Sequence, residues 1–405
     1  MDLEDRLRAA MAAAVDGQQP PGNLTALVRR RHRRHVLRTS VAGAAAVAVV
    51  AVLIPVGAKL LSYLPRTAEE QSPAASTVYV EFQDKLTSTV VPISAPTSRP
   101  GRPIRVGGSL AVAPDGATLY ASSGAETIPI STATNQPGQP IHVSGYLTVD
   151  PNGEIAYAAG PFGGKLTPVD LASDKPGQPI HTGCGDVGTI AFTPDGKTAY
   201  VSCSTIGPGR VIPVNTATGQ LGKPVQVSAG GREIAITPDG KTAYVLGEDA
   251  VTPINTATNT AGRPIPLRAN ATAMIAISPD GKTAYVGTTG TVIPISTATN
   301  TPGQPIHIGT GVPAEEMVFT PDGQTLYVAN SEGAAGRVVP ISTATNTPGK
   351  PIFVGTAVLI TITPDGKTVY AAAQNKVVPI STTTNRVGQP IRLPYGLPGW
   401  IVAAP

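Results

Sequence analysis

Residues 237–245 read Thr-Pro-Asp-Gly-Lys-Thr-Ala-Tyr-Val, and the same nine residues stand at 193–201. Close variants surround five further prolines. Self-similarity at a fixed period of roughly 20 to 50 residues is the signature of a repeat architecture. The motif therefore predicts one structural unit that recurs along the chain. Its anchor prolines, 37 to 44 residues apart, are Pro114, Pro151, Pro194, Pro238, Pro279, Pro321 and Pro364.

Each period reads as four short strands, labelled a to d from the inside of the structure outward. In one repeat, residues 234–236 form an apolar strand a, a Thr-Pro-Asp-Gly turn follows, and strand b carries Tyr244. Strand c contains Val-x-Pro-Ile, a Thr-Ala-Thr-Asn turn follows, and strand d begins at a second Pro-Ile. The proline in strand c predicts a bulge or a short ladder there. Four strands in about 40 residues are typical of a β-propeller blade.

The two ends of the repeat region decide the blade number. Residues 73–108 supply strands b, c and d without a strand a, whereas residues 400–405 supply a strand a alone. Together they make one blade, which closes the ring and removes an open sheet edge. We therefore predict an all-β propeller of eight four-stranded blades over residues 73–405, with seven blades as the alternative.

Composition excludes several classes of protein. The 405 residues include 44 Gly and 41 Pro, which argue against long helices in most of the chain, and the 41% apolar content argues against a disordered chain. The net charge of +4 belongs to residues 1–38, which carry eight Arg and four acids. The remaining residues carry 22 bases and 22 acids, so the propeller offers no electrostatic argument for a nucleic-acid partner.

The N-terminal part predicts a membrane anchor. A largely uncharged apolar run over residues 39–64 is long enough to cross a bilayer as one helix. The Arg-rich run before it should stay cytoplasmic, which places residues 1–38 inside the cell and the propeller outside, after a linker over residues 65–72. A cleaved export signal is the alternative. Within residues 1–38, a short amphipathic helix is either a cytoplasmic docking element or part of a weakly structured tail.

The repeats resemble the YVTN-type, or YncE-like, β-propeller repeat family of bacterial surface proteins. Tyr244-Val245, the segment 254–259 (Ile-Asn-Thr-Ala-Thr-Asn) and the segment 237–241 carry the resemblance, which covers residues 73–405. This chain usually has Ser or Asn where the family often has Asp before Thr-Ala-Thr-Asn. The resemblance implies a surface location, and its members commonly have seven blades.

Repetition separates scaffold residues from candidate site residues. Eight of the eleven tyrosines share one position in strand b, so we interpret them as packing residues. The residue five before each anchor proline varies around the ring, whereas the next residue is apolar in every blade. We therefore predict a binding mouth formed by Tyr146, Glu233, Glu316 and Trp400. The variable loops on the same face add Asp186, Arg232, Arg268 and Arg337. The alternative is that unconstrained loops simply vary.

Cys184 and Cys203 are the only cysteines. Cys184 precedes strand a of its blade and Cys203 ends the adjacent strand b, so both lie at one end of the same sheet. A disulfide between them is geometrically reasonable and suits an exported domain, and two free buried thiols are the alternative.

The predicted function is a membrane-tethered module that binds an unknown extracellular protein or glycan. The variable loops contain no histidine, which argues against a Ser-His-Asp site. His142, His181 and His307 fall on the outer rim, which argues against a metal or catalytic role because metal ligands must converge in space. No cofactor and no metal are predicted. The alternative is a metal-assisted lactonase-like or lyase-like propeller enzyme, in which Glu233 and Glu316 would serve on the variable face.

Overall fold

The computed structural model describes residues 76–84, 87–160, 163–204, 209–231, 233–267, 271–309, 313–332, 335–356, 359–394 and 396–405. The chain divides into two compact units, Met1–Glu69 and Glu70–Pro405. The anchor predicted over residues 39–64, its cytoplasmic flank 1–38 and the linker 65–72 lie outside the described residues. Within the described ranges, no helix is long and apolar enough to cross a membrane.

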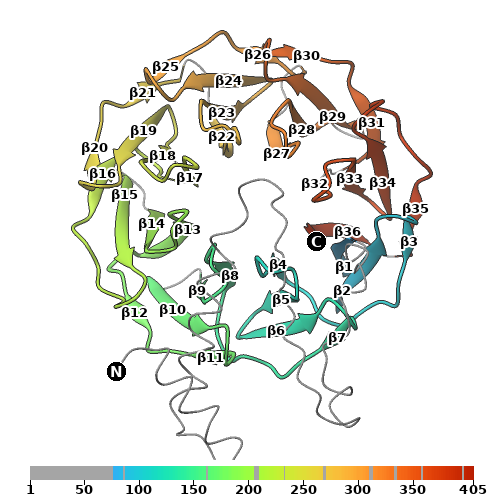
Figure 1. The fold of residues 1–405 in the computed structure, drawn as a ribbon, viewed down its shortest axis with the longest axis horizontal. Helices are drawn as coiled ribbons and strands as arrows, with labels where there is room; N and C mark the ends of the chain where they lie inside the picture. Colours follow the sequence, from blue (N-terminus) through green and yellow to red (C-terminus); the bar gives the residue numbers. More distant parts are fainter. Residues whose placement is uncertain are drawn as a thin grey trace, which may run out of the picture. The chain divides into compact units, whose positions relative to one another are not determined.

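Eight antiparallel sheets form a ring of eight blades, as predicted, and the seven-blade alternative is wrong (Figure 1). The strands of each class follow the ring order of the blades, from blade 1 to blade 8. The a strands are β4 (Ser109–Val112), β8 (Tyr146–Val149), β13 (Asp186–Phe192), β17 (Glu233–Ile236), β22 (Ala271–Ile277), β27 (Ala314–Phe319), β32 (Leu359–Ile362) and β36 (Leu397–Ala404). The b strands are β5 (Thr118–Ser123), β9 (Ile155–Ala159), β14 (Thr198–Ser204), β18 (Thr242–Leu246), β23 (Thr283–Thr288), β28 (Thr325–Glu332), β33 (Thr368–Ala373) and β1 (Thr77–Asp84).

The c and d strands complete the blades toward the outside. The c strands are β6 (Glu126–Ser131), β10 (Lys165–Asp170), β15 (Gly209–Asn215), β19 (Ala250–Asn255), β24 (Thr291–Ser296), β29 (Ala335–Ser342), β34 (Lys376–Ser381) and β2 (Thr87–Ser94). The d strands are β7 (Gln136–Pro137), β11 (Lys175–Pro176) with β12 (Ile180–His181), β16 (Val225–Val227), β20 (Thr260–Ala261) with β21 (Ile265–Pro266), β25 (Thr301–Pro302) with β26 (Ile306–His307), β30 (Thr347–Pro348) with β31 (Ile352–Gly355), β35 (Ile391–Arg392) and β3 (Arg99–Pro100).

Strand β36 closes the ring by pairing with β1, which confirms the predicted composite blade. The register runs from Thr77 opposite Ala404 to Gln83 opposite Leu397. At the end of β36, the Cδ atom of Pro405 lies 2.7 Å from the position that a Cβ atom on Gly116 of blade 1 would take. Anchor prolines of other blades pack in the same way on the next blade, so Pro405 acts as the anchor proline of blade 8.

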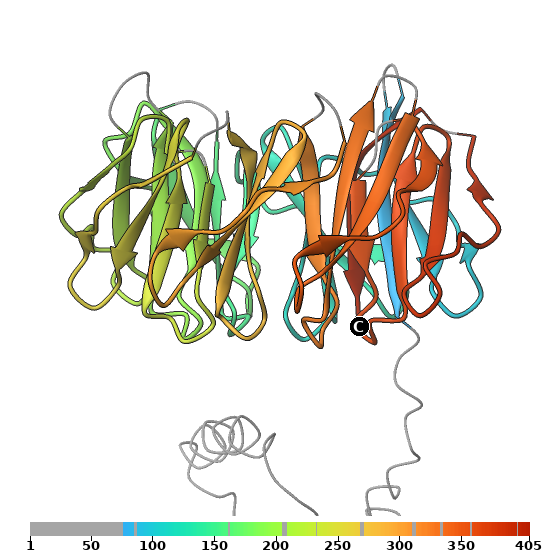
Figure 2. The ribbon, with the colours of Figure 1, turned by 90° about the horizontal axis from the view of Figure 1, so that it is seen from above.

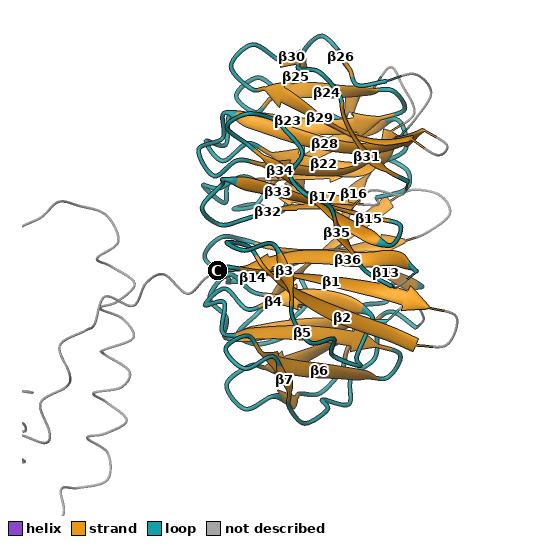
Figure 3. Ribbon diagram, turned by 90° about the vertical axis from the view of Figure 1, so that its right-hand side faces the viewer, coloured by secondary structure: helices purple, strands orange, loops and turns teal. Residues whose placement is uncertain are grey.

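The ring has two unlike faces, which are visible from the side (Figures 2 and 3). The a–b turns and the c–d turns lie on one side, here called the turn face. The b–c and d–a connections lie on the other side, here called the loop face. Because Thr77 pairs with Ala404, the first residue of β1 and a residue near the end of β36 lie together at the turn face.

Strand d is split, and the proline in strand c is the reason. In blade 4, Pro253 pairs opposite Tyr244 without a bulge, and its carbonyl accepts the Gly262 N–H at 2.7 Å. Because the N and C=O of one residue point to the same side, the missing N–H of Pro253 faces strand d and leaves the ladder to strand b intact. A Cβ on Gly262 would lie 3.2 Å from the Pro253 ring, so glycine suits this position. The short ladder expected from the sequence is therefore the one between c and d.

The core lies between the blades, in eight clusters shared by neighbouring sheets. The strand-b tyrosines belong to it and also join the blades. Tyr244 of blade 4 donates its hydroxyl hydrogen to Asn300 Oδ1 in the c–d turn of blade 5, at 2.7 Å. Asn300 has a φ of 54°, which asparagine tolerates better than most residues. Equivalent pairs are Tyr79–Asn135, Tyr120–Asp174, Tyr200–Asn259, Tyr285–Asn346 and Tyr327–Asn385.

Tyr157 is the exception among these tyrosines. Blade 3 has Gly219 where most other blades have asparagine, and the buried Tyr157 hydroxyl has no hydrogen-bond partner among the described residues.

We expect Tyr244→Phe to lower the free energy of unfolding by about 1 kcal/mol, because it leaves Asn300 Oδ1 unpaired. Tyr157→Phe should be neutral or slightly stabilising, because no bond is lost. Urea unfolding of the two variants measures the difference, and equal losses would refute this account of the repeated tyrosine.

Candidate functional site

The predicted mouth residues belong to β8, β17, β27 and β36, which are innermost strands of the ring (Figure 1). Tyr146 and Glu233 begin β8 and β17, Glu316 lies in β27, and Trp400 lies in β36. These strands belong to blades 2, 4, 6 and 8. The four blades between them carry smaller or apolar residues at the same position, namely Ser109, Thr189, Met274 and Leu359. The large polar and aromatic side chains therefore alternate around the mouth.

Glu233 and Glu316 reach from one blade to the next. Glu316 Oε2 accepts the backbone N–H of Ile360 in blade 7 at 2.6 Å. Glu233 likewise accepts a hydrogen bond from the backbone of Ile275 in blade 5. Burial raises the pKa of each carboxyl group to about 7, against the opposing effect of these hydrogen bonds, and nearby Glu315 raises that of Glu316 further. Both carboxyl groups therefore change from protonated to ionised near neutral pH.

These raised pKa values predict a stability that falls with rising pH. A carboxyl group whose pKa is higher in the folded state stabilises the fold most below its unfolded pKa, and this contribution is lost as the pH rises through about 7. We expect the melting temperature to fall between pH 5 and pH 8. In the double variant Glu233→Gln/Glu316→Gln, the melting temperature should depend less on pH. At pH 8 its free energy of unfolding should be higher than that of the wild type by about 1 to 3 kcal/mol per site.

A turn-face carboxylate provides the control for that measurement. Thr320 and the Gln324 N–H donate to Asp322, and they hold its pKa below the usual range. Asp322→Asn should therefore leave the slope between pH 5 and pH 8 unchanged. Thermal unfolding at several pH values measures all three proteins. A slope that survives in the double variant would contradict the assignment of pH dependence to the mouth.

Trp400 and Leu397 form an apolar spot beside the mouth. The Trp400 side chain is 44% exposed and that of Leu397 is 54% exposed. Both lie on β36, where Gly399 is the extra residue of a bulge opposite Glu81 and Phe82. In a regular strand, side chains three positions apart point to opposite faces. The extra residue at the bulge turns Leu397 and Trp400 to the same face of β36. The only tryptophan of the chain is therefore presented to solvent at the loop face.

Glu81 is a buried carboxyl group beside the mouth that the sequence did not indicate. It pairs opposite Trp400 from β1, is fully buried, and accepts the Gly108 N–H of blade 1 at 3.4 Å. Burial raises the pKa of its carboxyl group. The missed signal was its place two residues after the repeated tyrosine, where the other blades carry Ser122, Ala159, Ser202, Leu246, Gly287, Ala329 and Ala372. The carboxyl group of Glu81 thus joins blade 8 to blade 1, as Glu233 and Glu316 join their own blades to the next ones.

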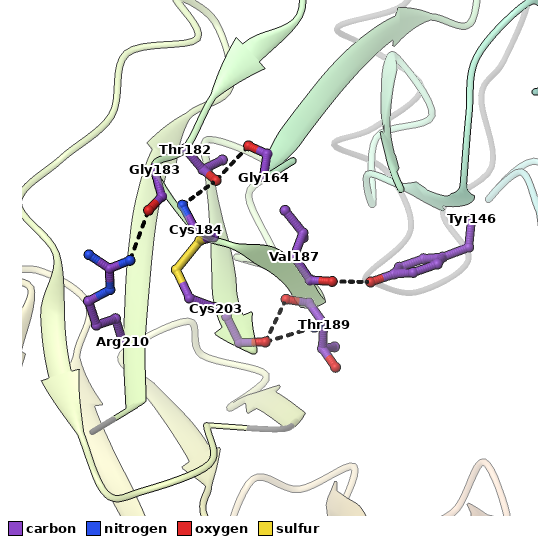
Figure 4. The surroundings of a disulfide bond; sticks show 10 residues. Tyr146, Gly164, Thr182, Gly183, Cys184, Val187, Thr189, Cys203 and Arg210 are labelled. Carbon is purple, nitrogen blue, oxygen red and sulfur yellow. Dashed lines mark hydrogen bonds between the residues drawn. A yellow bond between two sulfur atoms is a disulfide. The ribbon is translucent and has the colours of Figure 1, made fainter. Parts of the chain in front are cut away.

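A disulfide joins Cys184 and Cys203, with their Cα atoms 5.2 Å apart (Figure 4). It lies at the loop-face end of blade 3, where β13 contains a bulge between Val187 and Ile190. The Tyr146 hydroxyl donates to the carbonyls of Val187 and Gly188 on this bulge. The disulfide loop is therefore connected directly to one of the mouth residues.

Neighbouring hydrogen bonds hold the same loop in place. Thr182 Oγ1 donates to the Gly164 carbonyl of blade 2 at 2.7 Å and accepts the Cys184 N–H at 3.2 Å. Arg210 donates to the Gly183 carbonyl at 2.9 Å (Figure 4). The loop before β13 is thus fixed to two blades, and the disulfide fixes it to strand b of its own blade.

The remaining predicted site residues are not all near the mouth. Asp186 begins β13 and pairs opposite Ser204, close to the disulfide. Arg337 lies on the c strand β29, toward the outside of blade 6, with its guanidinium 5.7 Å from the centre of the Phe353 ring. The structure therefore does not bring Arg337 to the mouth. Arg232 and Arg268 lie outside the described residues.

The mouth offers recognition chemistry of two kinds. The raised pKa values allow the glutamates to donate as well as accept hydrogen bonds near neutral pH, and Trp400 supplies an exposed aromatic surface. Among the described residues, no three His, Cys, Asp or Glu side chains gather as a possible metal-ligand set. The arrangement suits a partner with polar groups and an apolar patch.

Comparison with known proteins defines the fold. No family model matches the sequence, and no curated protein matches it in sequence. Dihydro-heme d1 dehydrogenase NirN in complex with DHE is similar over 84% of this chain and 78% of its own, at 15% identity and a TM-score of 0.68. Apo AztD from Citrobacter koseri is similar over 82% and 98%, at 14% identity and a TM-score of 0.63. Hydrazine synthase from Kuenenia stuttgartiensis is similar over 71% and 95%, at 20% identity and a TM-score of 0.52. At these identities, the similarity concerns the propeller fold alone.

Proposed function

We propose that this chain is a membrane-tethered binding module, which holds an extracellular protein or glycan against the mouth of its propeller. The exposure of Trp400 carries the proposal. The tyrosines that recur in strand b are buried. The only tryptophan of the chain is in contrast 44% exposed, close to the exposed Leu397. Tryptophan and tyrosine are enriched among the residues that contribute most to binding energy at interfaces.

The position of β1 supports an outward orientation of the mouth. β1 begins at the turn face, so under this proposal the chain that follows the anchor leads to that face. Twelve residues separate the proposed anchor from Thr77 and span at most about 40 Å, so the proposal places the turn face toward the bilayer and the loop face away from it. The resemblance to the YVTN-type repeat family supports the surface location. Protease treatment of intact cells tests this orientation, and cleavage confined to the Thr-Ala-Thr-Asn turns would contradict it.

A metal-assisted lactonase-like or lyase-like enzyme is the second candidate, favoured by two carboxyl groups with pKa values near 7. Metal analysis of the purified full-length protein separates the two functions. The binding proposal expects the wild type and the Glu233→Ala/Glu316→Ala variant to contain the same amount of metal. A stoichiometric metal that disappears in the variant would favour the enzyme.

The binding proposal predicts a large effect of one substitution. We expect Trp400→Ala to weaken binding by about 30-fold, which corresponds to about 2 kcal/mol. The assay screens the full-length protein, in phosphatidylcholine nanodiscs, against a glycan array and a displayed library of surface proteins. Phe353→Ala is the matched control, because Phe353 is 63% exposed but lies on the outer strand β31. Equal binding by the two variants would overturn the assignment of the mouth.

A further inference from the structure

The charges of the propeller are unevenly distributed between its faces and its outer wall. The outer wall is defined here as the segment from the c–d turn through strand d of each blade, residues 256–267 in blade 4. The eight segments contain nine Lys or Arg residues and one acid, Asp174. The excess of positive charge on the wall is therefore balanced by acids elsewhere on the propeller, as the nearly neutral total requires.

The wall charge is concentrated on two adjacent blades. Arg386 and Arg392 lie on blade 7, and Arg99, Arg102 and Arg105 lie on blade 8. The outer strands of these blades, β35 and β3, neighbour each other in the ring (Figure 1). Arg99 and Arg386 occupy equivalent repeat positions near the turn face, and Arg105 and Arg392 do so nearer the loop face. These five residues are called the arginine patch.

The arginine patch has no internal neutralisation. All five side chains are exposed, and none forms an ion pair with a carboxylate within the described residues. In contrast, the turn-face lysines Lys197, Lys241, Lys282 and Lys367 each pair with the aspartate two residues before them. The β34–β35 pairing also places Lys376 directly opposite Arg392. Like charges directly opposite each other destabilise a sheet, so folding alone gives no reason for this pair.

We propose that the arginine patch binds a linear polyanion through its phosphate or carboxylate groups. Guanidinium groups are planar, always charged and suited to bidentate hydrogen bonds with both groups. Arg99, Arg102 and Arg105 follow one extended segment at intervals of three residues, which are at most about 11 Å long. With the equivalent arginines of blade 7, they form two neighbouring rows along the wall. A polymer with repeated anionic groups can engage both rows at once, whereas a single small anion can engage only part of one.

The test compares two variants that each lose four positive charges. The wall variant replaces Arg99, Arg105, Arg386 and Arg392 with alanine, and the matched control replaces Lys197, Lys241, Lys282 and Lys367 with alanine. All eight residues are exposed. The full-length proteins, in phosphatidylcholine nanodiscs, are titrated with polyphosphate and separately with polygalacturonate. Because both variants keep residues 1–38, the N-terminal arginines contribute equally to both.

We expect the wild type to bind at least one of the two polymers, and polyphosphate and polygalacturonate distinguish phosphate from carboxylate recognition. The wall variant should bind at least 10-fold more weakly at 0.15 M salt, and the slope of log K against log salt should fall by about 3. The control should change affinity less than 2-fold. Equal losses in both variants, or no loss in the wall variant, would overturn the proposal. Binding to anionic lipid vesicles without binding to either polymer would also overturn it, in favour of a membrane contact.

Discussion

Deleting residues 397–405 is expected to abolish cooperative folding of the propeller. The deletion removes β36, so β1 loses its inner partner and blade 8 loses its strand a. Val80 and Phe82 of β1 are buried in the intact propeller and would lie beside an open edge after the deletion. The buried side chains of Ile401 and Ala404 would be removed altogether. The lost hydrogen bonds and apolar contacts amount to on the order of 10 kcal/mol, comparable to the whole stability of a typical domain.

Circular dichroism during heating and gel filtration measure the effect of this deletion. We expect the truncated chain to show no sharp thermal transition and to associate through its open edge. Trp400→Ala is the control on the same strand, because it removes an exposed side chain and keeps the β1–β36 pairing. Its melting temperature should stay within a few degrees of the wild type. A truncated chain that melts cooperatively at the wild-type temperature would show that the ring does not depend on β36.

Replacing both cysteines with serine is expected to lower the free energy of unfolding by about 3 kcal/mol. The disulfide joins residues 19 apart in the sequence, and a cross-link of that length restricts the unfolded chain by about this amount. For a propeller of this size, the loss corresponds to a melting temperature about 5 °C lower. Without the disulfide, the bulge that Tyr146 contacts at Val187 and Gly188 is held less firmly. We therefore also expect faster amide exchange over residues 187–190 in the cysteine variant.

A reducing agent provides the control for the cysteine variant. Dithiothreitol should lower the melting temperature of the wild type to that of Cys184→Ser/Cys203→Ser, and it should not affect the variant. Differential scanning calorimetry measures both proteins with and without the reductant. If the reductant left the wild type unchanged, the disulfide would contribute nothing to the stability of the loop face.

The repeat made the scaffold predictable from the sequence. Proline and tyrosine recur in every period because each blade needs the same turn and the same contact with its neighbour. The spacing therefore gave the blade number, the ring closure and the burial of residues such as Tyr244 and Ile234. The hydrogen bond from Tyr244 to Asn300 escaped prediction, because it joins residues 56 apart in different blades.

The site was less predictable because it depends on departures from the repeat. Gly399 is a bulge residue in β36, and no pattern of alternation marks where an extra residue is accommodated. Glu81 was overlooked because its importance comes from Gly108 of the next blade. The sequence pattern assigned Arg337 to a loop of the variable face. In the structure it belongs to β29, the third strand of blade 6 counted from the ring axis, and so lies away from the mouth. The split of strand d likewise depends on which side of strand c the Pro253 nitrogen faces.

Position-specific photo-crosslinking on intact cells tests the central claim most directly. Benzoylphenylalanine replaces Trp400 at the mouth in one version of the protein and Phe353 on the outer wall in the other. We expect irradiation to produce a crosslinked surface protein or glycan with the probe at residue 400 and none with the probe at residue 353. A partner captured only at residue 353, or one captured at residue 400 that is a cytoplasmic protein, would contradict a binding mouth that faces outward.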